Sequence, residues 1–454
     1  MKKQVETYNP YTGEKLKSYN FNSNSEVNSK LETANQTFND WSNKPIAHRV
    51  KLLKNLANLL EDNKQEYANL MTEEMGKPIS QSIAEIEKCA TLCDFHIANA
   101  ENFLADQIIE TEASESFISY DPLGAILAIM PWNYPFWQVF RFAVPTLTAG
   151  NVGLLKHASN VTGTALAIQK LFTDAGYPEG CFQTLIIQHD QMDSLLENDT
   201  IKAVTLTGSE KAGRSIAALA GKNLKKTVLE LGGNNACIVL DDANLDKYID
   251  TMVKARMQNN GQSCIAAKRF IVTKNIYDIF LTTFTNKVKD LKQANPKDYD
   301  AYSTSMARED LAKELEEQVS KSLQLGAKVH YGNLRDKAKY QPTIITEVTT
   351  DMPIFKEETF GPVAAIIKAK DKTEALNLAK NSRFGLGTMI FTEDIDNIYQ
   401  DISQIPDGAL FINEMVKSDP RLPFGGTKAS GYGRELSKEG ILEFVNTKTV
   451  YINK

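Results

Sequence analysis

The sequence has few of the residues that build disulfide-rich and metal-binding proteins. It contains five cysteines and five histidines in 454 residues. An odd number of scattered cysteines argues against a disulfide framework and fits a reducing compartment, so we expect a cytoplasmic protein. Cys89 and Cys93 stand one helical turn apart, but no neighbouring Cys or His completes a site. We therefore expect no metal.

Long apolar runs and an excess of basic residues are also missing. The longest apolar stretches, such as 125–130, are far shorter than the roughly 20 residues that a membrane span requires. No apolar run follows Lys2 and Lys3, so a secretory signal is not expected. The 51 Lys and Arg residues face 57 Asp and Glu residues, which gives a net charge of −6. Because nucleic-acid binders carry a basic excess, we expect no nucleic acid and no membrane as a partner.

What is present is the pattern of an α/β protein. Apolar residues at helical spacing predict a helix between Asn43 and Asn63, within a helical lead-in of about a hundred residues. Strand and helix patterns then alternate, and a second alternating block runs from 236 to about 430. Such alternation predicts two large α/β domains with mainly parallel sheets. The expected strands of the first block are 125–130, 152–155, 184–187, 203–207 and 226–231.

The last segment, 444–452, alternates like a strand but has no obvious partner within the second block. We expect it to pair either with the apolar run around Phe117 or with another subunit.

Cys264 is the first candidate for chemistry. It follows Gly261-Gln262-Ser263, between a helical pattern and an apolar segment, where a turn could present a thiol. On the residue alone, a buried structural cysteine is the simpler interpretation. A catalytic role requires a nearby base, cation or helix N-terminus that increases the thiolate fraction.

Glu230 is the second candidate. It lies in an apolar run that ends in Gly232 and Gly233, so its carboxylate is expected to lose solvent. Desolvation raises the pKa of a carboxyl group, which would make Glu230 a candidate general base near neutral pH. A buried ion pair, or exposure at the strand end, is the alternative.

The segment 205–215 invites comparison with a phosphate loop. It is one substitution away from the pattern G-x-x-x-x-G-K-[ST], because Arg214 occupies the lysine position. A guanidinium does not readily replace that lysine, so hydrolysis of a nucleoside triphosphate is disfavoured. The Gly208-Ser209 turn between a strand and a helix could still hold a pyrophosphate.

Taken together, these segments resemble the aldehyde dehydrogenase superfamily over nearly the whole chain. Seven motifs carry the resemblance: Pro131-Trp132-Asn133-Tyr134-Pro135, Leu155-Lys156, Thr207-Gly208-Ser209 with Gly213, Glu230-Leu231-Gly232-Gly233, Gly261-Gln262-Ser263-Cys264, Glu357-Glu358-Thr359-Phe360-Gly361-Pro362 and Pro423-Phe424-Gly425-Gly426. One such motif is a weak signal, but seven in family order are specific.

The resemblance implies a fold and an assembly. It implies two doubly wound α/β domains and a small β oligomerisation arm. The dinucleotide-binding domain, with its helical lead-in, would comprise 1–104 and 123–232, the catalytic domain 233–431, and the arm 105–122 and 432–454. An arm exchanged between subunits implies a homodimer or a homotetramer.

The resemblance also implies residue roles. Cys264 would attack an aldehyde, Asn133 and the Cys264 backbone N–H would stabilise the oxyanion, and Glu230 would activate the water that hydrolyses the thioester. The cofactor would be NAD or NADP. Its contacts would be Ile129, Trp132, Lys156, Ser159, Gly208, Ser209, Gly213, Glu358 and Phe360.

The predictions of the substrate and of whether the 2′-phosphate of NADP is accepted each rest on one or a few single residues. Arg141 stands where succinate-semialdehyde dehydrogenases place an arginine for the distal carboxylate, although an ion pair within the protein is an equally good interpretation. Gln258 departs from the arginine of many members, as in a bacterial branch of that subfamily, and Arg421 could add a second charge. Ser159 replaces a glutamate of NAD-dependent relatives, so we expect NADP to be tolerated and NAD to be usable.

The leading hypothesis is therefore oxidation of succinate semialdehyde. The alternatives are a broader aliphatic, amino or betaine aldehyde dehydrogenase, in which Arg141 serves structure, and a catalytically silent binding relative. The joint presence of Cys264, Glu230 and Asn133 disfavours silence.

Overall fold

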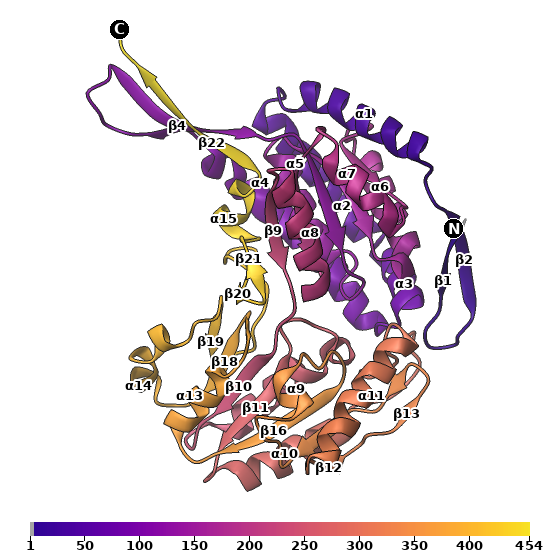
Figure 1. Cartoon of the computed structure of the whole chain (residues 1–454), viewed down its shortest axis with the longest axis vertical. Coiled ribbons are helices and arrows are strands. Elements are labelled where there is room, and N and C mark those ends of the chain that lie inside the picture. Colours follow the sequence, from indigo (N-terminus) through magenta and orange to yellow (C-terminus); the bar gives the residue numbers. More distant parts are fainter. Residues whose placement is uncertain (1–3) are drawn as a thin grey trace.

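The computed structural model describes residues 4–454 and contains two lobes, each built around a mainly parallel sheet (Figure 1). Residues 1–3 of the predicted segment 1–104 lie outside the described residues. Within residues 4–454, no helix combines the length and the apolar character that crossing a membrane would require.

The first sheet has the strand order β21-β9-β8-β5-β6-β7. Strands β5 to β9 run parallel to one another, and β21 pairs antiparallel with β9 at one edge of the sheet. The strands are β5 (Ala125–Met130), β6 (Val152–His157), β7 (Phe182–Thr184), β8 (Ile201–Thr207), β9 (Lys226–Glu230) and β21 (Gly431–Tyr432).

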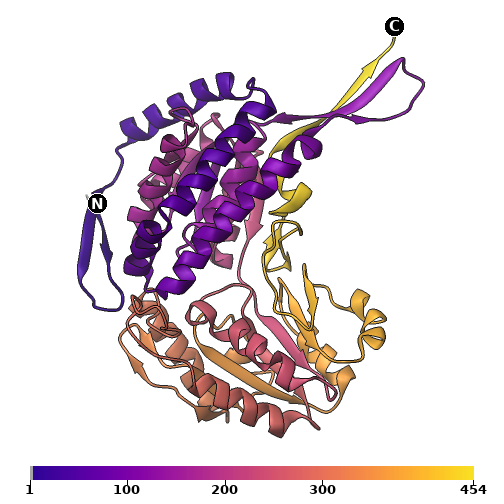
Figure 2. The same cartoon turned by 180° about the vertical axis from the view of Figure 1, so that it is seen from behind.

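The helices of the first hundred residues cover this sheet from behind (Figure 2). Their apolar faces enter one core together with α5, as the helical spacing between Asn43 and Asn63 predicts. The helices of the lobe are α1 (Asn24–Trp41), α2 (Ile46–Asp62), α3 (Lys64–Met75), α4 (Ile79–Leu104), α5 (Trp137–Thr148), α6 (Thr162–Asp174), α7 (Met192–Glu197) and α8 (Glu210–Lys222).

One predicted strand is shifted. The pattern at 184–187 predicts a strand there, but β7 ends at Thr184. The Ile186 N–H instead donates to the Asn22 side chain, and the Ile186 carbonyl accepts from the Asn22 N–H. The N-terminal segment therefore satisfies the backbone that a longer strand would have used.

The second sheet has the order β12-β15-β16-β11-β10-β18-β19, with β12 antiparallel. Alternate residues of β10 enter two different cores, Ile238 on one face and Cys237 on the other, so helices cover both faces as predicted. The strands are β10 (Asn235–Val239), β11 (Ala267–Thr273), β12 (Lys328–Tyr331), β15 (Thr343–Thr346), β16 (Val363–Ala369), β18 (Thr388–Phe391) and β19 (Leu410–Ile412); the helices are α9 (Leu245–Met257), α10 (Tyr277–Lys289), α11 (Glu309–Gln324), α12 (Pro353–Lys356), α13 (Lys372–Lys380) and α14 (Ile395–Tyr399).

A narrow arm extends away from the lobes (Figure 1). It consists of β3 (Gln107–Ile108), β4 (Glu115–Pro122) and β22 (Val445–Ile452), with α15 (Ser437–Leu442) leading into β22. Phe117 faces Val450 in the antiparallel register, so the last segment pairs with the Phe117 run, one of the two expected partners.

Short elements complete the chain. Three small hairpins or ladders are β1 (Gln4–Tyr8) with β2 (Lys15–Asn20), β13 (Arg335–Asp336) with β14 (Lys339–Tyr340), and β17 (Phe384–Gly385) with β20 (Thr427–Lys428). Four single 3₁₀ turns are η1 (Ser159–Val161), η2 (His189–Gln191), η3 (Gln258–Gly261) and η4 (Ile402–Gln404).

Candidate active site

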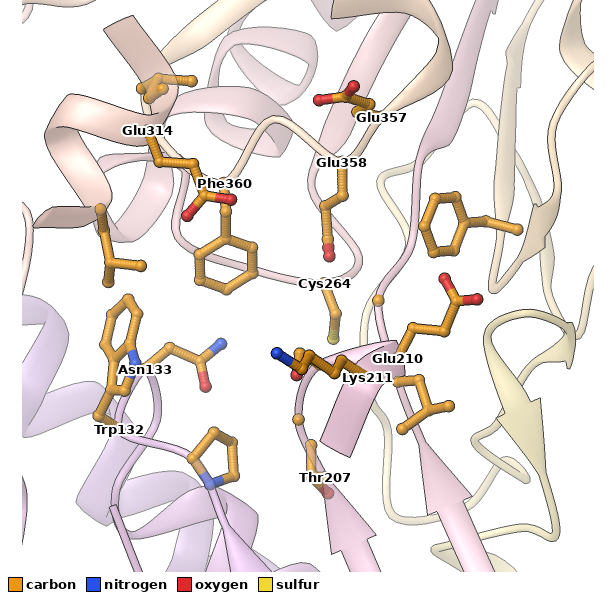
Figure 3. Close-up of a pocket in the computed structure, with 18 of the residues that line it drawn as sticks. Trp132, Asn133, Thr207, Glu210, Lys211, Cys264, Glu314, Glu357, Glu358 and Phe360 are labelled. Atoms are coloured by element: carbon orange, nitrogen blue, oxygen red, sulfur yellow. The ribbon is translucent and has the colours of Figure 1, made fainter. Parts of the chain in front are cut away.

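A cavity of about 760 Å³ lies where residues of the two lobes meet (Figure 3). Its walls come from the β5–α5 turn, the start of α8, the Cys264 loop and the segment 357–360. A second cavity of about 180 Å³ shares Cys264 and Gln138 with the first. Cys264 is thus accessible from two sides, which a purely structural cysteine would not require.

An unusual turn presents Cys264. Asn259, Asn260 and Gly261 have consecutive positive φ angles of 53°, 51° and 68°, which two of them adopt without the freedom of glycine. A Cβ on Gly261 would collide with the Gly361 carbonyl oxygen, so only glycine fits there. The Asn260 side chain binds the backbone of 304 and 305, which holds the strained turn in place.

Burial controls the ionisation of Cys264. Desolvation raises the pKa of its thiol to about 11, and the positive charges of Lys268 and Arg141 oppose that rise. The Lys268 ammonium donates to the Cys264 carbonyl at 2.6 Å and lies 3.2 Å from a carboxylate oxygen of Glu358. Lys268 is thus the nearby cation that a catalytic cysteine needs, and our sequence analysis did not single it out. A lysine within the wholly buried strand β11 was the available signal.

Hydrogen bonds of its backbone carbonyl and its side-chain amide fix Asn133, and one hydrogen of that amide has no partner among the described residues. Its carbonyl accepts from the Asn259 amide at 2.7 Å, and its own amide nitrogen donates to the Gln262 carbonyl at 3.1 Å. An amide nitrogen carries two hydrogens, so one remains for an oxyanion. Figure 3 shows this nitrogen and the Cys264 sulfur directed into the same space.

A buried ion pair supports the Asn133 turn from below. Lys77 contacts Glu85, and the side chains are 0% and 2% exposed. The other oxygen of Glu85 accepts from the backbone N–H groups of Phe136 and Trp137, each at 2.9 Å. Neither charged residue was expected from the sequence.

Glu230 ends β9 and is buried, with neither carboxylate oxygen hydrogen-bonded among the described residues. Desolvation and the neighbouring Glu435 raise the pKa of Glu230 well above its usual value, while Arg141 opposes them, so the expected direction of the shift is confirmed. Its carboxylate does not line either cavity, and one oxygen lies beside Gly425.

Six of the nine expected cofactor residues, Ile129, Trp132, Lys156, Ser159, Gly208 and Ser209, lie at or just after the carboxyl ends of β5, β6 and β8. Ile129 of β5 pairs with Lys156 on one side and with Leu206 on the other. Chain connections leave β5 in opposite directions here, which is where ligands bind in open parallel sheets. Lys156 and Ser159 line a small hollow of about 30 Å³ beside this point rather than the large cavity.

The start of α8 forms one wall of the large cavity. Gly208 and Ser209 line it, and Ser209 caps the helix by accepting from the Ala212 N–H. Gly213 does not line the cavity, because it faces Leu231, whose side chain a Cβ would strike. It therefore allows α8 to pack closely on the segment after β9.

Glu358, Phe360 and Trp132 form the facing wall. Glu358 accepts from the Gly233 N–H at 3.0 Å, and a Cβ on Gly232 would collide with the same carboxylate. The rings of Trp132 and Phe360 meet edge to face with centroids 5.7 Å apart.

Arg141 and Gln258 line the smaller cavity, but Arg141 is also paired. Its Nε lies 2.8 Å from a carboxylate oxygen of Glu435, and its Nη2 donates to Gln138. The interpretation of Arg141 as part of an ion pair within the protein is thus confirmed, and its role in binding substrate stays a prediction. The structure does not bring Arg421 to either cavity, because its side chain is 77% exposed, is bound to Asp419 and lies outside both linings.

A family model described as the aldehyde dehydrogenase family matches residues 1–450. The chain belongs to the aldehyde dehydrogenase family. A probable succinate-semialdehyde dehydrogenase [NADP(+)] of Synechocystis is 49% identical over 451 residues, 99% of each chain. Succinate-semialdehyde dehydrogenase [NADP(+)] 1 of Mycobacterium tuberculosis (strain ATCC 25618 / H37Rv) is 44% identical over 454 residues, also 99% of each chain. The crystal structure of a succinic semialdehyde dehydrogenase from Streptococcus pyogenes in complex with NADP⁺ superposes with a TM-score of 0.97 at 36% identity, covering 99% of this chain and 100% of that one.

The remaining four cysteines of this aldehyde dehydrogenase lie in the protein interior. Cys89, Cys93, Cys181 and Cys237 are free and buried, and desolvation raises the pKa of each thiol. Within residues 4–454, no group of three His, Cys, Asp or Glu residues is placed to hold a metal ion.

Proposed function

We propose that this aldehyde dehydrogenase oxidises succinate semialdehyde to succinate with NADP, and with NAD as a usable alternative. The observation that carries the substrate is Arg141, a buried guanidinium in a cavity of about 180 Å³ that also contains Cys264. A guanidinium fork is the partner that a distal carboxylate prefers. The names of its full-length relatives support the same substrate.

The large cavity fits the nicotinamide and pyrophosphate parts of a dinucleotide, whose adenosine end would reach the small hollow beside Lys156 and Ser159. Its volume lies within the usual range for cofactor sites, and α8 offers backbone N–H groups for a pyrophosphate. We assign the phosphate end to Gly208 and Ser209, the adenosine end to Ile129, Lys156 and Ser159, and the nicotinamide end to Trp132, Glu358 and Phe360. Gly213 acts indirectly by letting α8 approach.

Ser159 and Lys156 support acceptance of NADP. Ser159 is exposed and uncharged, and Lys156 has no carboxylate within 4 Å among the described residues. A 2′-phosphate would meet a hydroxyl and a cation there rather than an anion.

The first half of the reaction belongs to Cys264 and Asn133. The Cys264 thiolate attacks the aldehyde carbon, and the carbonyl π electrons move to oxygen. The free Asn133 N–H and the Cys264 backbone N–H stabilise that oxyanion. Trp132, Glu358 and Phe360 would hold the nicotinamide of NADP or NAD, which would supply the acceptor for the hydride that leaves this carbon, and Cys264 would then carry a thioester.

The second half belongs to Glu230. A raised pKa makes its carboxylate a stronger base than an exposed glutamate, so it takes a proton from the water that attacks the thioester. The tetrahedral adduct then expels the Cys264 thiolate and releases succinate. Because Glu230 lies outside the cavity lining, its side chain rotates towards the cavity for this step.

We further propose a cytoplasmic homodimer or homotetramer. The outer edge of β22 lacks a strand partner among residues 4–454, since the arm has the order β22-β4-β3. Such an edge is a template for a strand of a second copy. Gel filtration with light scattering tests this assignment, and a monomer at micromolar concentration contradicts it.

The substrate is tested with a panel of aldehydes followed by the absorbance of NADPH. We expect succinate semialdehyde to be preferred over butanal, which has the same length without charge, and over a cationic amino-aldehyde. Arg141→Met should raise the KM for succinate semialdehyde much more than that for butanal. Equal weakening of both would assign Arg141 to structure and favour the broader aldehyde dehydrogenase.

A further inference from the structure

Lys88 is a half-buried cation that forms no ion pair with a carboxylate of the described residues. It lies on α4 and lines the smaller cavity together with Arg141 and Cys264. Among residues 4–454, no carboxylate oxygen lies within 4 Å of its ammonium. A cation removed from water without a partner is costly, so its retention calls for an explanation.

The carboxylates near Lys88 are engaged elsewhere. Glu85, one turn earlier on α4, binds Lys77 and the two N–H groups at the start of α5. Asp419 is bound to Arg421 by two hydrogen bonds of 2.8 and 2.7 Å. Neither can move to Lys88 without leaving a partner unsatisfied.

Neutral contacts hold the Lys88 ammonium in place. It donates to the Ser418 hydroxyl at 2.8 Å and lies 4.1 Å from the centre of the Trp137 ring. The same hydroxyl accepts from the Trp137 indole N–H at 2.9 Å. An ammonium has three donors, and only one of them has a hydrogen-bond acceptor among the described residues.

A second cation faces the same cavity. The positive charge of Arg141 and burial together lower the pKa of Lys88 to about 8. Two like charges therefore line a cavity whose one lining carboxylate, that of Glu85, is paired with Lys77, while Glu435, the partner of Arg141, lies outside the lining. An anionic group entering the cavity would relieve this imbalance.

We propose that Lys88 is a substrate-binding residue, which together with Arg141 binds the distal carboxylate of the aldehyde. This inference rests on the proposed function and adds to it the second cation that the sequence analysis assigned to Arg421. Lys88 occupies that role because it lies inside the cavity, whereas Arg421 is on the surface.

The first test compares succinate semialdehyde with butanal in two variants. Lys88→Met removes the charge and preserves the length of the side chain, and it should raise the KM for succinate semialdehyde about tenfold or more, with kcat and the KM for butanal nearly unchanged. Lys88→Arg keeps the charge and should retain most of the affinity. Lys417→Met is the matched control, because Lys417 lines the same cavity but pairs with Glu414.

Three outcomes separate the two proposals. If the unaltered enzyme does not prefer succinate semialdehyde over butanal, the proposed function fails. If the preference exists and Lys88→Met retains it, only the role of Lys88 fails. Equal losses for both aldehydes would mean that Lys88 merely supports Trp137 and Ser418, and they also overturn the proposal.

The second test uses pH and starts from the unaltered enzyme, so its first measurement does not depend on how a variant folds. The charged groups around Lys88 are Glu85 on its own helix, Arg141 on α5, and Asp419 and Lys417 on the loop after β19, with the Cys89 thiol beside it. The ratio of kcat/KM for succinate semialdehyde to that for butanal cancels the shared ionisation of Cys264.

Because lysine is charged below its pKa, this ratio should fall as the pH rises through about 8. The fall should disappear in Lys88→Met and move to higher pH in Lys88→Arg. A constant ratio in the unaltered enzyme, or a fall that persists in Lys88→Met, contradicts the proposal.

Discussion

Lys77 and Glu85 form a buried ion pair directly beneath the turn that carries Asn133. One carboxylate oxygen of Glu85 meets Lys77 and the other caps the start of α5. The ion pair thus supports the turn that carries Asn133, the proposed oxyanion donor.

Removing one partner of this pair should destabilise the protein strongly. Lys77→Met leaves the Glu85 charge buried without a partner, which costs about 3–5 kcal/mol. Urea unfolding followed by circular dichroism measures the loss. Lys64→Met is the control, because Lys64 and its partner Glu87 are 38% and 46% exposed and their pair is worth less than about 1 kcal/mol. Similar losses in both variants would contradict the importance of the buried pair.

The reactivity of Cys264 should increase with pH far into the alkaline range. Only the thiolate is alkylated, and a pKa raised to about 11 postpones its formation, so the rate with iodoacetamide should still rise at about pH 10. Lys268→Met should slow the reaction at each pH, since Lys268 lowers that pKa. Cys264→Ser should abolish rapid labelling, because the other four thiols are buried. A plateau near pH 8.5 would disprove the raised pKa.

Glu230→Gln should separate the two halves of the reaction. The amide cannot take a proton from water, so the thioester should accumulate after one equivalent of NADPH per active site, and steady-state turnover should fall about 10²–10⁴-fold. Rapid-mixing absorbance measures the burst, and mass spectrometry detects the acylated Cys264. Asn133→Ala, by contrast, should reduce the burst rate itself. A Glu230→Gln enzyme without a burst would remove Glu230 from the hydrolytic step.

Ser159→Glu should shift the cofactor preference towards NAD. The new carboxylate would repel a 2′-phosphate and could bind ribose hydroxyls, so the ratio of kcat/KM for NADP to that for NAD should fall about tenfold or more. Ser159→Ala controls for loss of the hydroxyl alone. An unchanged ratio would place the 2′-phosphate away from Ser159.

Gly261→Ala should inactivate the enzyme through crowding as well as through backbone strain. Its φ of 68° is unfavourable for alanine, and the added Cβ would collide with the Gly361 carbonyl oxygen. Gly326→Ala isolates the strain, because Gly326 has a φ of 106° with no heavy atom within 4 Å of the added Cβ. We expect activity to be lost only in Gly261→Ala, with Gly326→Ala costing roughly 1–3 kcal/mol of stability. Equal activities would show that the Cys264 turn tolerates adjustment.

The sequence predicted the fold and the candidate site best where the pattern of a short segment has a direct physical explanation. Alternating patterns predicted strands β5, β6 and β8, and Cys264 and Glu230 stood out by their local sequence, whereas Asn133 was indicated only by the family resemblance. The 184–187 strand was misplaced because its backbone partner, Asn22, lies more than 150 residues away.

The residues that sequence reasoning missed act through contacts between distant segments. Lys268 and Glu358 are 90 residues apart, and Lys88 and Ser418 are 330 residues apart. No local periodicity can show that such charges meet. The same limit explains why the sequence suggested Arg421 as a second charge at the substrate although it lies away from the cavity. It is charged and close in sequence to the Pro423 motif, yet it binds Asp419 two residues away instead of reaching the cavity.

The course of the chain after β21 links assembly to turnover. Gly431 pairs with Glu230, Glu435 follows beside Arg141, and the short helix α15 then leads to β22 at Val445. We therefore expect a displacement of β22 to move Glu435, ten residues before Val445, whose carboxylate lies near Glu230, the proposed general base. A variant with a shortened C-terminus, or a fusion placed there, would alter the acid–base environment of a site it does not touch.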